Sequence, residues 1–124
     1  MRRVLLVDDN PQVRQSLCEV FKREADFDVC GEAENGREAI DQANSLHPDL
    51  IVMDLSMPVL NGLEAVRLLK DLMPKVPVII YTSHSGQFVE TEAHAAGAAA
   101  TVSKSESIAV LVRTIRSLLD EIAA

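Results

Sequence analysis

The sequence predicts an α/β protein in which one parallel β-sheet is covered by helices on both faces. Short, nearly continuous apolar runs recur along the chain, as expected of strands that are buried on both sides. The longer segments between them carry apolar residues every three or four positions, which is the spacing of an amphipathic helix. Five strands alternate with five helices in this way, a pattern that predicts parallel strands joined by right-handed helical crossovers.

The first strand is predicted at Val4–Val7, where the apolar run is unbroken. Asn10 then reads as a helix N-cap and Pro11 as a residue of the first turn, so a helix should run from there to about Glu24. The second strand is predicted at Phe27–Ala33. Helical spacing assigns the inward face of the first helix to Val13, Leu17, Val20 and Phe21.

The second helix is predicted to begin at the turn Glu34–Gly36 and to close at His47 and Pro48, because proline is common just beyond a helix. The third strand follows at Leu50–Met53, and a loop covers residues 54–61. The inward residues of the second helix are Ala39, Ile40, Ala43 and Leu46.

A third helix follows this loop, and the fourth strand is predicted at Pro77–Tyr81. The polar loop Ser83–Gly86 leads to a short, alanine-rich fourth helix that ends at Gly97, a residue suited to a left-handed C-cap. A fifth strand is predicted at Ala99–Ser103 and a last helix from about Ser107. The third helix should bury Leu63, Val66, Leu69, Leu72 and Met73, and the last helix Ile108, Leu111, Val112, Ile115, Leu118, Leu119 and Ile122.

Composition and charge exclude several classes of function. The formal net charge is −7 and the twelve basic residues are scattered, which argues against direct contact with nucleic acid. The apolar run behind the basic start is too short for a signal peptide or a membrane span, so we expect a cytoplasmic domain without a membrane partner. Cys18 and Cys30 lack the spacing of a metal site, and we expect two reduced thiols.

Polar residues follow four of the predicted strands. Asp8 and Asp9 end the first strand, Asp54 the third, Thr82 the fourth, and Lys104 the fifth. In open parallel sheets, ligands bind outside the carboxyl ends of the strands, so these side chains are predicted to share one site. Three unpaired carboxylates on one edge would repel one another, and an all-oxygen site of this kind suits magnesium.

Each of these residues also has a purely structural interpretation. An aspartate that ends a strand is usually a cap or turn residue, a single lysine is usually a solvated surface group, and a threonine is ordinary in a strand. The coincidence of Asp54, Lys104 and Thr82 at successive strand ends of one sheet favours a common site over three separate accidents.

Four motifs together resemble the receiver domain of two-component response regulators: VDDN after the first strand, DLSMPVLNG after the third, YTS at the fourth, and the lysine that follows the fifth. The spacing of Asp54, Met57, Pro58 and Gly62 is the most specific part. The match covers essentially the whole chain and therefore implies a single receiver domain over residues 1–124. It also implies a flavodoxin-like sheet with strand order 2-1-3-4-5.

The resemblance implies a metal site for Mg²⁺ or Mn²⁺. Asp9 and Asp54 are expected as direct ligands, with the backbone carbonyl of Ser56 as a third and Asp8 acting through a metal-bound water. The cation would offset the repulsion between these carboxylates and an entering phosphoryl group.

The resemblance further implies that Asp54 accepts phosphate from a histidine kinase or a phosphotransfer protein. Lys104 would pair with one phosphoryl oxygen, and the Thr82 hydroxyl would move to bond another. The loop Ser83–Gln87 would follow Thr82, so the readout surface is expected on the fourth helix, fifth strand and fifth helix, where phosphorylation could also form a homodimer. Thr101 stands where receivers usually carry an aromatic residue, so either the readout surface is expected to be more permissive or the switch is expected to depend on Thr82 and its loop alone.

Two other functions fit a sheet of this kind. A phosphatase with an aspartyl-phosphate intermediate would carry a second acid two residues after the nucleophile, where this chain has Ser56. A flavin carrier would need a phosphate-binding loop, but two aspartates follow the first strand instead. The five predicted strands and helices use the whole sequence, so the chain is expected to be either a stand-alone receiver or part of a longer regulator with an output domain.

Overall fold

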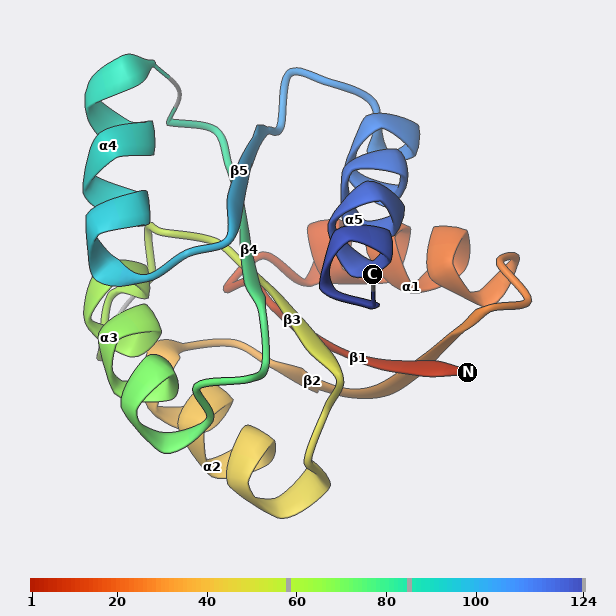
Figure 1. Ribbon diagram of the computed structural model, residues 1–124, viewed down its shortest axis with the longest axis horizontal. Helices are drawn as coiled ribbons and strands as arrows, with labels where there is room; N and C mark the ends of the chain where they lie inside the picture. Colours follow the sequence, from red (N-terminus) through yellow and green to blue (C-terminus); the bar gives the residue numbers. More distant parts are fainter. Residues whose placement is uncertain (58, 85, 124) are drawn as a thin grey trace.

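A computed structural model describes residues 1–57, 59–84 and 86–123 and shows a three-layered α/β/α arrangement (Figure 1). Five parallel strands form one sheet in the order β2-β1-β3-β4-β5, which confirms the predicted flavodoxin-like topology. Pro58 of the DLSMPVLNG motif and Ser85 of the polar loop lie outside the described residues. None of the described helices is both long and apolar enough to cross a membrane.

The boundaries of the elements follow the sequence pattern closely. The strands are β1 (Arg2–Val7), β2 (Phe27–Ala33), β3 (Leu50–Met53), β4 (Val78–Thr82) and β5 (Ala100–Ser103). The helices are α1 (Pro11–Lys22), α2 (Gly36–Leu46), α3 (Gly62–Leu72), α4 (Gln87–Ala96) and α5 (Ile108–Ala123).

The differences from the predicted boundaries are small and occur at element ends. β1 begins two residues before the predicted Val4, because Arg2 and Arg3 continue its pairing with β2 despite their polar side chains. α1 ends at Lys22, before the predicted Glu24. β4 begins after Pro77 and extends through Thr82, which pairs with β5.

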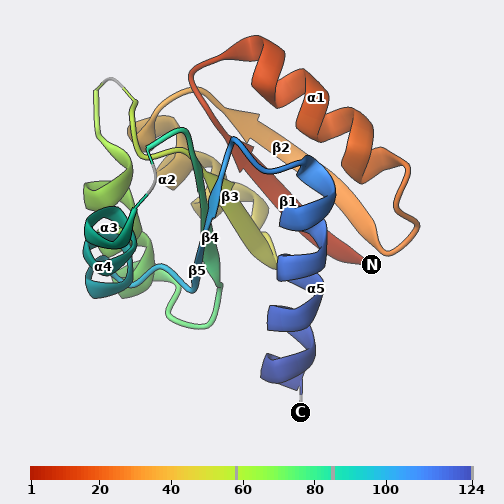
Figure 2. The same cartoon turned by 90° about the horizontal axis from the view of Figure 1, so that it is seen from above.

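The helices cover the two faces of the sheet unequally (Figure 2). α1 and α5 pack on one face, and α2, α3 and α4 on the other. Alternate residues of β1 serve the two faces: Val4 and Leu6 contact the α1/α5 side, whereas Leu5 and Val7 contact the opposite side. Both faces of the central strands are therefore buried, as their continuous apolar sequences predicted.

Two residues predicted to face inward are exposed. Leu72 is 55% exposed because α3 ends there, and the next residue, Met73, packs against the core in its place. Ile122 is 57% exposed because the last turn of α5 runs past the edge of the sheet (Figure 2). Helical spacing predicts an apolar face along the whole length of a helix. At the end of a helix no neighbouring strand or helix covers that face, so the predicted burial is wrong there.

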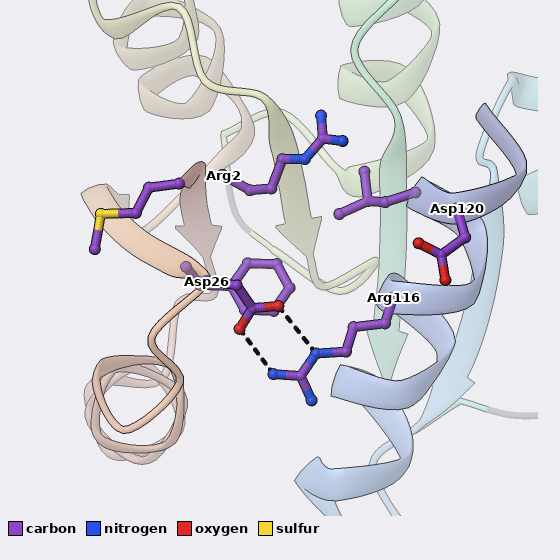
Figure 3. A pocket seen from close by; sticks show the side chains of 7 residues that line it. Arg2, Asp26, Arg116 and Asp120 are labelled. Carbon is purple, nitrogen blue, oxygen red and sulfur yellow. Dashed lines mark hydrogen bonds and ion pairs between the residues drawn. The ribbon is translucent and has the colours of Figure 1, made fainter. Parts of the chain in front are cut away.

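A cluster of charged side chains lies at the amino-terminal edge of the sheet, beside a hollow of about 270 Å³ (Figure 3). Arg116 of α5 donates to both oxygens of Asp26, at 2.8 and 3.1 Å, and to Glu24 at 3.0 Å. Its guanidinium carbon lies 5.5 Å from the centroid of the Phe27 ring. Arg116 therefore ties α5 to the turn between α1 and β2.

Candidate functional site

The register of the sheet brings the predicted site residues to one edge. Val7 pairs with Met53, so Asp8 and Asp54 follow neighbouring strands at the same level. The Asp54 amide donates to the carbonyl of Val7 at 3.0 Å. The Lys104 amide donates to the carbonyl of Thr82 at 2.7 Å. Backbone hydrogen bonds thus fix the positions of these residues independently of the contacts between their side chains.

Asp8 is the most constrained acidic residue of this edge and is 1% exposed. Its Oδ2 accepts from Lys104 Nζ at 2.7 Å, and its Oδ1 accepts from the backbone amide of Asn10 at 2.9 Å. The Asn10 side chain in turn accepts from the amide of Gln12 and caps α1. The first turn of α1 and the side chain of Asp8 therefore hold each other in place.

Asp54 is 6% exposed and is less well satisfied than Asp8. Its Oδ2 lies 3.4 Å from Lys104 Nζ, but its Oδ1 has no hydrogen-bond partner among the described residues. Burial raises the pKa of Asp54, the Lys104 charge lowers it, and the Asp8 charge raises it, with a net shift upward. A charged Asp54 is therefore costly to this fold in the absence of a further positive group.

Lys104 links the two buried carboxylates, with its side chain 19% exposed. Burial lowers its pKa, but the bonds and charges of Asp8 and Asp54 outweigh burial, so the pKa lies above its usual value. One ammonium cannot neutralise both partners and Asp9 as well.

The acidic residues fit a divalent cation. One carboxylate oxygen each from Asp8, Asp9 and Asp54 lies within 4.8 Å of the others. Oxygen donors of this kind are those that magnesium and manganese use, and within the described part of the chain Asp54 Oδ1 has no hydrogen-bond partner that would compete with a cation. Asp9 is exposed, so the cluster opens to solvent on one side. Ser56, the predicted source of a backbone carbonyl, is exposed in the loop that follows Asp54.

Thr82 is fully buried at the end of β4, beside Ser103 of β5. Its hydroxyl accepts from the backbone amide of His84 at 3.1 Å. The hydroxyl is therefore engaged with its own loop, and a change in its partner would move the residues that follow it.

Gly62 explains part of the motif that follows β3. A Cβ at this position would lie 2.5 Å from the carbonyl oxygen of Asp54 and 2.6 Å from Cα of Leu55, distances that only glycine avoids. The Gly62 amide donates to the Leu55 carbonyl at 2.9 Å. The start of α3 thus packs directly on the backbone that carries Asp54.

Two contacts of this site were not predicted from the sequence. Lys104 was assigned to a phosphoryl oxygen, but in this structure it is bonded to Asp8. Arg14 was not singled out, yet its Nη1 donates to the backbone carbonyl of Asp8 at 2.6 Å. Its place one turn into the helix that follows VDDN was the available signal, but helical spacing does not show which backbone group a long side chain reaches.

Comparison with known proteins agrees with this geometry. The sequence model of the family "Response regulator receiver domain" matches residues 4–116. A protein-glutamate methylesterase/protein-glutamine glutaminase from Methanosarcina mazei is 38% identical over 98% of this chain, which spans 34% of that relative's length. The chemotaxis protein CheY of Thermotoga maritima is 37% identical over 78% of this chain and 80% of its own length.

A solved structure gives the same result. The crystal structure of a LuxR-family two-component response regulator from Aurantimonas sp. SI85-9A1 superposes with a TM-score of 0.93. It is 34% identical, and the match covers 98% of this chain and 86% of that one. The matched family model, the sheet order and the acidic edge agree, and the chain belongs to the response regulator receiver domain family.

Proposed function

We propose that residues 1–124 form one receiver domain that accepts a phosphoryl group on Asp54 from a histidine kinase or a phosphotransfer protein in the cytoplasm. The observation that carries this proposal is the state of Asp54: buried, 3.4 Å from Lys104, and with Oδ1 unpaired among the described residues. A carboxylate held in this way is a nucleophile that can form an acyl phosphate.

We expect direct bonds to Mg²⁺ or Mn²⁺ from Asp9, Asp54 and the backbone carbonyl of Ser56. Asp8 would interact with the ion through a metal-bound water. When bound, the cation offsets the negative charge of the carboxylates and of the phosphoryl oxygens. Asp8 and Asp9 keep their places during the transfer because the capped start of α1 fixes the backbone between β1 and α1.

Among the described residues Lys104 pairs with two carboxylates, and phosphorylation would turn its ammonium away from them. Its ammonium bonds Asp8 at 2.7 Å and lies 3.4 Å from Asp54. A phosphoryl group on Asp54 supplies new anionic oxygens next to Lys104, and the ammonium turns from the carboxylates to one of them. The Thr82 hydroxyl turns from the His84 amide to another oxygen of the phosphoryl group.

The signal would leave through α4, β5 and α5. α4 is held to the core chiefly by small side chains, Ala93 and Ala96, and its Phe88 is 77% exposed. Thr101 of β5 is half-buried and does not fill an aromatic-sized space, so the switch depends on Thr82 and the loop after it. Movement of that loop would change the apolar surface offered to an output domain, a partner protein or a second copy of the domain.

The domain acts in signalling rather than in steady-state turnover. The residue two positions after Asp54 is Ser56, which cannot serve as the acid that an aspartyl-phosphate phosphatase uses at this place. Loss of the phosphoryl group is therefore slow in comparison with such enzymes.

The test is incubation with acetyl phosphate and Mg²⁺, followed by intact-mass measurement and size-exclusion chromatography. We expect a gain of one phosphoryl group in the wild-type chain, and no gain in Asp54→Asn or in the wild type with EDTA. Equal phosphorylation of Asp54→Asn would contradict the proposal.

A further inference from the structure

We infer that Arg14 is a positioning residue for the metal-binding edge, an inference that rests on the proposed function. Arg14 lies on α1, touches none of the three clustered carboxylates' oxygens in the described hydrogen bonds, and instead donates from Nη1 to the backbone carbonyl of Asp8 at 2.6 Å. It therefore acts on the cluster through the backbone of Asp8.

The other end of the guanidinium is fixed by β2. Arg14 Nε pairs with Glu32 Oε1 at 3.3 Å, and the Arg14 side chain is 18% exposed against 47% for Glu32. Burial raises the pKa of the Cys18 thiol, one turn after Arg14 on α1, and the charge of Glu32 raises it further. A planar guanidinium with two separate donors can hold both the β1–α1 turn and β2 in one geometry.

This contact completes the fixation of Asp8. Its amide donates to the carbonyl of Ala33 in β2, and its two carboxylate oxygens accept from the Asn10 amide and from Lys104. β1 ends at Val7, so the Asp8 carbonyl lies beyond the strand, and Arg14 supplies its donor. Without Arg14, this carbonyl loses a partly buried donor, and the turn that carries Asp8 and Asp9 gains freedom.

A preformed cation site requires that the turn carrying Asp8 and Asp9 is held rigidly. Groups that orient metal ligands from outside the ligand shell typically change metal affinity by about 10- to 100-fold when they are removed. Arg14 holds a backbone carbonyl rather than a ligand oxygen, so we expect the lower end of this range for Arg14→Ala, about 10-fold weaker Mg²⁺ binding. The maximal rate of phosphorylation should be retained, because Lys104, Thr82 and Asp54 stay in place.

The experiment measures two quantities on each variant. Mg²⁺ affinity is obtained from amide chemical shifts of Asp9 and Asp54 in NMR titrations, without any phosphodonor. The phosphorylation rate with acetyl phosphate is then followed as a function of Mg²⁺ concentration. For Arg14→Ala we expect about 10-fold more Mg²⁺ at half-maximal rate and a maximal rate close to that of the wild type. A purely structural role would lower the unfolding temperature and leave both quantities unchanged in the folded protein.

Two further variants and one control separate charge from geometry. Arg14→Lys keeps the positive charge but loses the planar group with two separate donors, and Glu32→Gln removes the charge that holds the guanidinium to β2. Both changes should weaken Mg²⁺ binding, though less than Arg14→Ala. Arg37→Ala removes an arginine that is 69% exposed and, among the residues the structure describes, pairs only with Asp41 on α2 at 3.9 Å, so Mg²⁺ binding should not change.

Wild-type Mg²⁺ affinity in Arg14→Ala or full affinity in Arg14→Lys would overturn the inference and leave the proposed function standing. A maximal rate that stays low at saturating Mg²⁺ would also overturn it. Failure of the wild-type chain to bind Mg²⁺ or to become phosphorylated would overturn the proposed function itself.

Discussion

Two clusters of acidic and basic side chains lie at opposite edges of the sheet, and they are built from the same kinds of residue. At the amino-terminal edge, Arg116 pairs with Asp26 (Figure 3) and also with Glu24, and its side chain remains 40% exposed. At the carboxyl-terminal edge, Lys104 lies between the buried Asp8 and Asp54, with Asp9 close by.

The difference lies in burial and in how completely each group is paired. The Arg116 bonds lower the pKa of Asp26, as expected of a satisfied carboxylate, whereas burial raises the pKa of Asp54. Exposed ion pairs are screened by water and contribute little to stability, and a buried, partly paired carboxylate is costly. The first cluster is therefore a structural tie, and the second is a group of carboxylates that could hold a cation.

The largest effect is expected for Lys104→Met. This change removes the positive group that we propose stabilises charge on the phosphoryl oxygens, so phosphorylation by acetyl phosphate should slow by about 100-fold or more. Rates at saturating Mg²⁺, measured by intact mass, check this. The control is Lys75→Met, which changes an exposed lysine in the loop before β4. A similar loss in both variants would show that Lys104 has no special place.

Asp8→Asn should have the next largest effect. The amide keeps the shape of the side chain but removes one negative charge from the cluster and weakens the bond to Lys104. Mg²⁺ affinity should fall by about 10-fold. Asp26→Asn removes a carboxylate of the same kind at the other edge and should leave Mg²⁺ affinity unchanged, as NMR or calorimetric titration would show. Loss of affinity in Asp26→Asn would end the distinction between the two clusters.

The two clusters also differ in how much of each could be predicted from the sequence. Strand order, helix positions and the placement of Asp8, Asp54 and Lys104 at one edge followed from apolar runs, capping residues and a family resemblance, because parallel strands share a carboxyl edge. The contacts of Arg14 and Arg116 could not be predicted from these sequence patterns. The partners of a long, flexible side chain depend on which groups lie near it in three dimensions. Neither the periodicity of apolar residues nor the spacing of a motif predicts those distances.

Asp54→Asn should stabilise the metal-free protein by about 1 kcal/mol, since it removes a buried charge that is not fully paired. The folded-state pKa of Asp54 lies above its ordinary value of 3.8, so the folded wild type binds the proton more tightly than the unfolded chain. The penalty is complete above the folded-state pKa and disappears as the pH falls toward 3.8. Urea unfolding in EDTA at several pH values should show the advantage of Asp54→Asn shrinking with acidity; a constant or growing advantage would contradict it.

The smallest effect is expected for Arg116→Ala. Its guanidinium is partly exposed and ties α5 to the turn before β2, so the unfolding temperature should fall slightly and the phosphorylation rate should not change. Thermal unfolding and the intact-mass assay test both parts. A clear change in the phosphorylation rate would mean that the two edges are coupled through α5.

On the proposed function, Asp54 accepts the phosphoryl group because a cation and Lys104 offset the negative charge around it. The most direct test of this proposal treats the protein with acetyl phosphate and Mg²⁺, reduces the product with borohydride, and locates the modified residue by peptide mass spectrometry. We expect reduction of an acyl phosphate at position 54 and at no other carboxylate, and no reduction at any position when EDTA is present. Modification spread over several carboxylates, or equally strong without Mg²⁺, would contradict it.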